Sequence, residues 1–216
     1  RNDLGVSDVR LSDGFFHNPP RDYNATTLEL IIVGILLKYK GHKILLEALA
    51  NIQHQRSWRL HIIGDGPEKK ALINMAHAGG LADKIIFHGR IKWGDDLFEK
   101  LEKAHLFILS SLTEGMPRVL LEAMAKGLPA VAANVGGVNE ILPLDVLFKP
   151  GDSNSMAQKI TEVWSNPERL QCLSTLNYTR IQEFRWARLS RLRKEWFERI
   201  SAVEEISDGG NNAGNI

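Results

Sequence analysis

The chain has 216 residues, of which 44% are hydrophobic and 25% charged, with a formal net charge of +1 at pH 7. These values are typical of a globular domain with a sizeable core, and a near-neutral charge gives no reason to expect nucleic acid as a partner. The longest uninterrupted apolar stretch, residues 30–37, is too short to cross a bilayer.

Short apolar runs and helical periodicity alternate through the middle of the chain. The runs predict strands at residues 28–33, 58–63, 84–88, 105–110, 130–133 and 146–148. Periodicity with start and stop signals predicts helices at residues 41–52, from after the turn at 64–67 through about residue 77, at 95–104, from 117 to the stop at 127, and at 138–142. This alternation predicts an α/β fold: a parallel, Rossmann-like sheet with helices on both faces and a ligand crevice at the carboxyl ends of the strands. No G-x-G-x-x-G run opens a helix, so a nicotinamide cofactor is not favoured.

The two ends of the chain differ from this middle. The chain opens with Arg1 rather than Met, which suggests a piece of a longer protein, and residues 1–24 are predicted to be an interdomain connection. Residues 25–180 are the predicted domain. Residues 181–206 are predicted to form a basic helix with an apolar stripe, for which a membrane surface is one interpretation. Residues 207–216, rich in Gly and Asn, are predicted to be a disordered tail.

The single cysteine, Cys172, excludes an internal disulfide and suits a reducing compartment. It is expected to be a small buried apolar residue. The expected location of the protein is therefore cytoplasmic, with the cytoplasmic face of a membrane as the second possibility.

Two glutamates eight residues apart, Glu114 and Glu122, are the most informative feature of the chain. Glu114 follows the strand that ends at Ser110. Pro117 has the fixed φ suited to the first position of the next helix, which carries Glu122 about 7–8 Å further along its axis.

Between these glutamates lies a predicted phosphate site. The amides around Gly115, Met116 and Arg118 are at the helix start, where an anion is favoured. A carboxylate on each side of a diphosphate fits a sugar nucleotide, whose sugar and ribose flank its diphosphate.

The surrounding sequence resembles the signature of retaining glycosyltransferases of the GT-B fold, family 4. The resemblance is carried by EGMP at 114–117, LEAMA at 121–125, GLPAV at 127–131 and GGVNEI at 136–141, and it extends over about residues 28–200. It implies the C-terminal half of a GT-B enzyme that transfers a hexose from a UDP or GDP sugar with retention, without a metal or other cofactor. Such enzymes act in polysaccharide or glycoconjugate synthesis.

The resemblance also implies roles for individual residues. Glu114 positions the donor sugar and is the catalytic candidate, whereas Glu122 holds the ribose hydroxyls. The remaining predicted donor-binding residues are Gly34, Lys40, Arg90, Ile91, Gly115, Met116, Pro117 and Arg118. Among them Lys40 matches the lysine that contacts the diphosphate, and the segment at 89–91 matches the one whose backbone cradles the nucleobase.

One departure from the family pattern removes a cation from the diphosphate. Ile35 stands where the family has arginine after Gly34. Lys38 is a partial substitute, although a lysine is not a bidentate fork.

Several other residues have two interpretations. Asp65 either caps the following helix or lines the ligand, and Gly136-Gly137 either forms a tight turn or presents amides to the donor. His88 and His105 are interpreted as polar residues at strand edges, because no His/Cys/Asp cluster has the spacing of a metal site.

By resemblance, an acceptor glycan or lipid would bind an N-terminal domain that this chain does not contain, and the helix at 181–206 would dock on that domain. The chain alone is expected to bind donor but to catalyse poorly. The rival interpretation is a non-catalytic nucleotide- or partner-binding module of the same fold. A nucleotide-sugar epimerase of GT-B fold is a third and weaker one, because it lacks the E-x7-E pattern.

Overall fold

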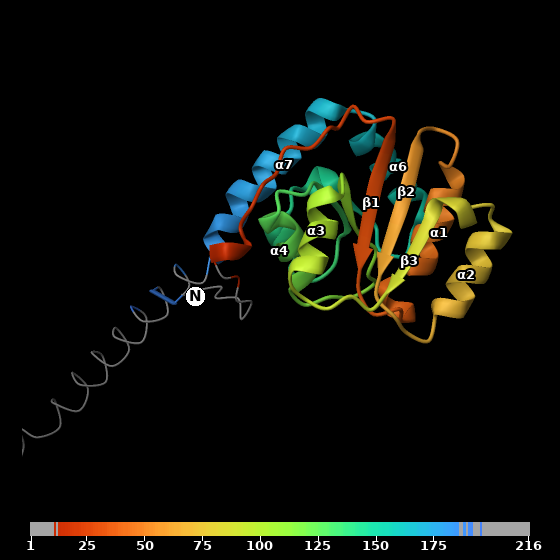
Figure 1. Cartoon of the computed structure of the whole chain (residues 1–216), viewed down its shortest axis with the longest axis horizontal. Helices are drawn as coiled ribbons and strands as arrows, with labels where there is room; N and C mark the ends of the chain where they lie inside the picture. The colour runs from red at the N-terminus through yellow and green to blue at the C-terminus, as the bar shows by residue number, and fades with distance from the viewer. Residues whose placement is uncertain (1–10, 12, 186–187, 189, 192–194, 196–216) are drawn as a thin grey trace, which may run out of the picture.

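The computed structural model describes residues 11, 13–185, 188, 190, 191 and 195. In this part of the chain six strands form one sheet in the order β3-β2-β1-β4-β5-β6, and every neighbouring pair is parallel. The strands are β1 (Thr27–Val33), β2 (Ser57–Ile63), β3 (Ile85–Gly89), β4 (Leu106–Leu109), β5 (Ala130–Ala133) and β6 (Leu147–Phe148). The predicted parallel α/β fold is therefore confirmed (Figure 1).

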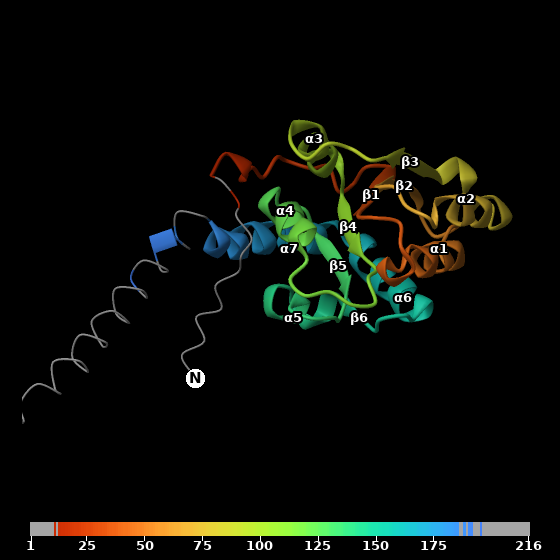
Figure 2. The same ribbon diagram turned by 90° about the horizontal axis from the view of Figure 1, so that it is seen from below.

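Helices cover both faces of this sheet, as predicted. They are α1 (His42–Asn51), α2 (Lys69–Ala78), α3 (Asp95–Lys103), α4 (Arg118–Ala125), α5 (Val138–Ile141), α6 (Ser153–Trp164) and α7 (Pro167–Ile181). Figure 2 shows α1, α2 and α6 on one side of the sheet and α3, α4 and α5 on the other. The chain thus winds outward from β1 in one direction and outward from β4 in the other.

Helices α6 and α7 are absent from the sequence prediction, although local signals mark both. The Asp152 carboxylate accepts hydrogen bonds from the amides of Asn154 and Ser155 at 3.1 and 3.0 Å, which caps α6. The Asn166 side chain accepts from the Arg169 amide at 2.9 Å and caps α7, which begins at Pro167. Helix α6 packs on α1 and α7 packs on α4, so both belong to the domain.

Strands β4 and β5 lie within the core, and all of their residues are buried. Strands β1 and β2 are less completely buried, because their side chains alternate between buried and partly exposed. Figure 1 shows no helix in front of these two strands. A polar ladder lies there: Glu29 accepts from Arg59 at 3.1 Å and contacts His61 at 2.7 Å, and His61 contacts His88 at 2.8 Å.

The described residues before β1 pack against the domain. Phe15 and Tyr23 are buried, and the Arg21 guanidinium donates to the carbonyls of Ala104 and Lys126, both at 2.8 Å. This part of the predicted connection at 1–24 is thus tied to the loops after α3 and α4.

The other end of the domain is α7, which ends at Ile181. Most of the predicted helix at 181–206, and all of the predicted tail at 207–216, lie outside the described residues. Cys172 is exposed, so the expectation that it is buried was wrong. No helix among the described residues is long and apolar enough to cross a membrane.

Candidate donor-binding site

The candidate site lies where the strand order reverses, between the carboxyl ends of β1 and β4. In open parallel sheets this switch point is the usual place for a ligand, because the loops leave the two strands in opposite directions. Here the two loops are joined directly. The Leu112 amide donates to the Tyr39 carbonyl at 2.7 Å, and the Ser110 hydroxyl donates to the Lys40 carbonyl at 2.7 Å.

Gly41 allows this close approach of the two loops. Its φ is 69°, and a Cβ at this position would lie 2.0 Å from the Ser110 carbonyl oxygen. Any other residue would therefore push the loop after β1 away from β4, and Lys40 would move with it.

Lys40 and Glu114, which the sequence placed in one site 74 residues apart, meet here. The Lys40 ammonium lies 2.6 Å from Glu114 Oε1, and the Ser111 hydroxyl donates to the same oxygen at 2.6 Å. Their side chains are only 22% and 12% exposed, so solvent weakens this pair less than it weakens a surface ion pair. Both contacts use Oε1, which leaves Oε2 for a ligand.

The space beneath this ion pair is small. The crevice contains a cavity of about 10 Å³, close to the least volume that accepts one water molecule. Its lining includes Ile32, Val33, Lys40, His42, Leu109, Ser110, Ser111, Glu114 and Val119. This cavity is too small for a sugar or a nucleotide.

His42 is a residue of this crevice that the sequence prediction missed. It is 3% exposed, and neither ring nitrogen has a hydrogen-bond partner among the described residues. Burial, with a smaller effect from the nearby Lys40 charge, lowers the pKa of His42 to about 4. The imidazole is therefore neutral at physiological pH. In the sequence, only the position of His42 directly after Gly41, at the start of α1, hinted that it belongs to this crevice.

Glu122 is also buried, with a side chain that is 4% exposed. Its Oε1 accepts hydrogen bonds from Arg118 Nε at 2.8 Å and from Trp93 Nε1 at 2.9 Å. Arg118 lies one turn earlier on α4, whereas Trp93 comes from the loop between β3 and α3. A buried carboxylate is stable only with such partners, and no sequence signal indicates that Trp93 is one of them.

The start of α4 differs from the prediction by one residue. The helix begins at Arg118, and Pro117 is its N-cap with φ −74° and ψ 101° rather than its first helical residue. The amides of Gly115 and Met116 make no hydrogen bond within the described residues, so both remain available to an anion.

The loop that carries Glu114 is held from the other side by the turn before α5. The Gly137 amide donates to the Gly115 carbonyl at 3.0 Å. Gly136 has a φ of 50°, and a Cβ there would lie 2.0 Å from the Glu114 carbonyl oxygen. Of the two interpretations of this glycine pair, the tight turn fits, and its effect is to fix the Glu114 loop.

Backbone hydrogen bonds join the loop after β1 to the end of β2 and to the loop that follows it. The Gly34 amide donates to the Ile63 carbonyl at 2.9 Å, and the Leu36 amide donates to the Asp65 carbonyl at 3.0 Å. The Asp65 carboxylate accepts from the Gly66 amide and pairs with Lys69 at 3.2 Å. Asp65 therefore makes a local turn and does not cap the first turn of α2.

Ile35 and the predicted residues Arg90 and Ile91 lie on the loops after β1 and β3. Ile35 is 45% exposed on the loop after β1, so it does not pack into the core. Arg90 is exposed and Ile91 is partly buried on the loop after β3.

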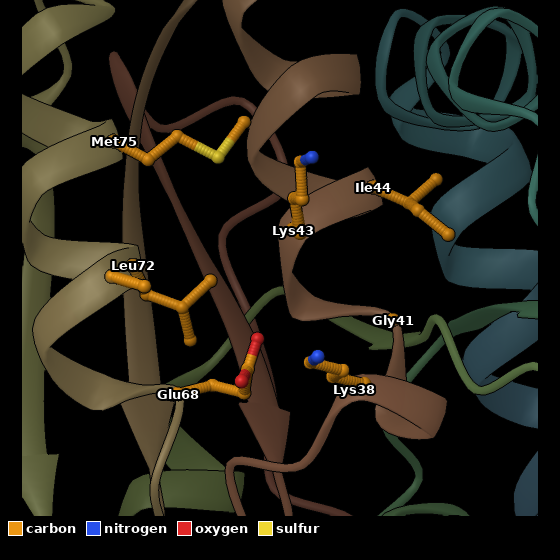
Figure 3. Close-up of a pocket in the computed structure, with 8 residues that line it drawn as sticks. Lys38, Gly41, Lys43, Ile44, Glu68, Leu72 and Met75 are labelled. Atoms are coloured by element: carbon orange, nitrogen blue, oxygen red, sulfur yellow. The ribbon is translucent and has the colours of Figure 1, made fainter.

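A separate hollow of about 630 Å³ lies between α1 and α2, away from the glutamates. Figure 3 shows Leu72 and Met75 pointing into it from α2, with Lys38 and Glu68 extending toward each other at one end. Lys38 therefore lines this hollow. Among the described residues no group of His, Cys, Asp or Glu could hold a metal ion.

The sheet order and the crevice define an α/β domain of the kind that GT-B glycosyltransferases contain. The chain belongs to the glycosyl transferases group 1 family, whose pattern matches residues 18–179.

Curated relatives agree. Protein CapJ of Staphylococcus aureus is 32% identical over 149 residues, which are 68% of this chain and 37% of CapJ. The lipopolysaccharide 1,6-galactosyltransferase of Escherichia coli K12 is 31% identical over 139 residues, 62% of this chain and 38% of that enzyme. The chain thus spans about two fifths of the length of these relatives.

Solved structures show the same fold. Anabaena Alr3699/HepE in complex with UDP has a TM-score of 0.75 at 23% identity, covering 89% of this chain and 56% of that protein. The C-terminal domain of a glycosyl transferase group 1 family protein (LpcC) from Francisella tularensis has a TM-score of 0.72 at 21% identity, covering 82% of this chain and 99% of that domain. The architecture is therefore that of a GT-B C-terminal half.

The burial of neutral His42 predicts a specific dependence of stability on pH. The pKa of His42 is about 4 in the folded chain, compared with the ordinary histidine value of 6.5 in the unfolded chain. Between these values only the unfolded chain takes up the proton, so stability falls as pH falls from about 6.5 to about 4. The free energy of unfolding should drop by about 2–3 kcal/mol more between pH 7 and pH 4.5 in the native protein than in His42→Gln.

Chemical denaturation at the two pH values measures this difference. His54→Gln is the matched control, because His54 is exposed, and it should keep the native pH dependence. An equal loss of stability in all three proteins would mean that His42 does not resist protonation.

Proposed function

We propose that this chain is the donor-binding domain of a retaining glycosyltransferase of family 4, which transfers a hexose from a nucleoside diphosphate sugar to an acceptor. The observation that carries the proposal is the 2.6 Å contact of Lys40 with Glu114 at the point where the strand order reverses. At this point a cation and a carboxylate lie side by side. The amides of Gly115 and Met116, which precede α4, are next to them, and Glu122 lies beyond on α4.

Each part of a sugar nucleotide has a complementary group in this arrangement. The diphosphate would contact Lys40 and the amides of Gly115 and Met116, since a helix start and a compact cation both favour phosphate. The sugar hydroxyls would reach Glu114 Oε2, and the ribose hydroxyls would reach Glu122. In this proposal Arg90 and Ile91 line the nucleobase.

Two glycines support an approach of the ligand to the backbone. A Cβ at Gly34 or Gly115 would meet nothing within 4 Å, and neither residue has a positive φ. Neither internal packing nor backbone conformation therefore requires glycine at these positions. A ligand lying close against the loops after β1 and β4 accounts for both.

The chemistry would be completed by a second domain. In the proposed reaction the bond between the anomeric carbon and the donor phosphate breaks, and the acceptor oxygen bonds to the same face of that carbon. The acceptor proton passes to the leaving phosphate. The acceptor, a glycan or lipid, would bind the second domain, so residues 1–216 alone should bind donor without appreciable transfer.

The proposed location is the cytoplasm.

A thermal-shift screen of UDP, GDP, ADP and their sugars tests the proposal. At least one nucleoside diphosphate should raise the melting temperature of residues 1–216, because a ligand bound only to the folded state stabilises it. Arms with Mg²⁺ and with EDTA should agree, since the proposal assigns no metal to the site. No shift with any nucleotide would contradict the proposal.

The second candidate is a non-catalytic nucleotide-binding module. Ile35 favours it, because an exposed isoleucine stands where the family has a cation for the diphosphate. The two candidates differ in how much the sugar should add to the binding affinity. A transferase domain should bind the nucleotide sugar more tightly than the nucleotide through Glu114, whereas a nucleotide module should not.

Substitution of the two glutamates should separate ribose binding from sugar binding. Glu122→Ala should weaken UDP binding by about 1.5–3 kcal/mol, the usual contribution of a hydrogen bond to a charged group. Glu114→Ala should leave UDP affinity largely unchanged but remove the extra affinity of UDP-glucose over UDP. Calorimetry of both ligands measures this, with GDP and its sugar used if the screen prefers guanine. Equal losses of UDP affinity in the two variants would contradict this division.

Restoring the family's arginine should tighten diphosphate binding. Ile35→Arg places a guanidinium on an exposed loop beside Gly34, where a charge-assisted contact to phosphate contributes roughly 1.5–3 kcal/mol. Calorimetry should show tighter UDP binding, unchanged uridine binding and a steeper dependence on salt. The control is Ile86→Arg, since Ile86 is an isoleucine with 37% exposure on β3. A gain of similar size in both variants would indicate only a general effect of positive charge.

A further inference from the structure

Glu122 is fixed by two side chains that approach the same oxygen from different elements. Trp93 Nε1 and Arg118 Nε both donate to Oε1, at 2.9 and 2.8 Å. No described residue donates to Oε2, although the side chain is 4% exposed. A carboxylate whose one oxygen is saturated and whose plane is fixed presents its other oxygen in one direction only.

The indole of Trp93 is itself fixed by packing, even though Trp93 is 51% exposed. The ring of Phe98 meets it edge-on, with centroids 5.4 Å apart and planes at 89°. Phe15 lies roughly parallel to it at 6.0 Å, and the Arg118 guanidinium lies 5.3 Å from its ring centre. The direction of the Nε1–H bond is therefore set by three neighbouring side chains rather than by solvent.

We propose that Trp93 is a positioning residue for the nucleotide: its indole N–H, together with Arg118, orients Glu122 so that Oε2 accepts the ribose hydroxyls. The inference rests on the proposed function, because it concerns the ribose end of the same donor site. It also makes the loop between β3 and α3 part of ribose recognition through Glu122.

The Arg118 side chain has contacts of its own, separate from the backbone amide that the sequence places at the phosphate site. Its Nε is engaged by Glu122 and its guanidinium lies over Trp93, so its main effect is on the glutamate rather than on the diphosphate. The two donors act on one oxygen, and loss of either should let the carboxylate rotate.

Affinities for UDP and for 2′,3′-dideoxy-UDP, which lacks both ribose hydroxyls, test the proposal by calorimetry. Trp93→Phe removes the N–H and keeps an aromatic ring. It should weaken UDP binding by roughly two- to tenfold, the effect of losing one hydrogen bond, and leave dideoxy-UDP binding unchanged. Trp58→Phe is the matched control, because the buried Trp58 indole nitrogen has no partner among the described residues. It should change neither affinity.

A double-mutant cycle shows whether Trp93 acts through Glu122. In the Glu122→Ala background, Trp93→Phe should cause no further loss of UDP affinity. Three results would overturn the proposal. A loss that persists in that background, or an equal loss for UDP and dideoxy-UDP, would mean that Trp93 contacts the nucleotide directly or only supports the fold. Tighter UDP binding by Trp93→Phe would mean that the indole occupies the ribose position.

These results are separate from a failure of the proposed function. If the native protein binds neither UDP nor GDP, the donor site itself is wrong. If the native protein binds UDP and discriminates against dideoxy-UDP, but Trp93→Phe discriminates equally well, only the role of Trp93 is wrong. Melting temperatures of all variants, measured in the same buffer, show whether each remains folded.

Discussion

Two carboxylates, the buried Glu122 and the partly buried Glu114, constrain the whole candidate site. A carboxylate removed from water needs hydrogen bonds or an opposite charge, and each glutamate obtains both on one oxygen. Glu114 Oε1 is held by Lys40 and Ser111, and Glu122 Oε1 is held by two groups from α4 and the loop before α3. No described residue donates a hydrogen bond to the second oxygen of either glutamate. The loops after β1, β3 and β4 must therefore meet, and the strand order that reverses at β1 and β4 brings them together.

Much of this arrangement could be predicted from the sequence, because its signals are local. Predicted runs of three to six residues became the parallel strands. The strand end at Ser110 and the helix start near Pro117 placed one glutamate on a loop and the other on a helix. That Lys40 and Glu114 belong to one site was predicted only through the resemblance to a family, and their direct contact was not predicted. Helices α6 and α7 were missed although Asp152 and Asn166, typical capping residues, precede them. The signals for these two helices are therefore local as well.

The remaining features depend on contacts between segments distant in the sequence. Nothing near Trp93 indicates that its indole reaches a glutamate 29 residues later. The burial of His42 follows from how α1 packs against the loop after β4, which no periodicity reveals. The sequence around Gly136 indicates only a turn. Glycine is required there because a side chain would collide with the Glu114 carbonyl oxygen. A pattern within one segment can place a residue on an element, whereas its partner is set by the packing of the whole sheet.

The central claim is that one ligand joins the two glutamates across a diphosphate. A crystal structure of residues 1–216 with UDP tests it most directly. The ribose hydroxyls should lie within hydrogen-bond distance of Glu122 Oε2, and the diphosphate should lie against Lys40 and the amides of Gly115 and Met116. UDP bound in the hollow between α1 and α2, or bound with its ribose away from Glu122, would contradict the claim.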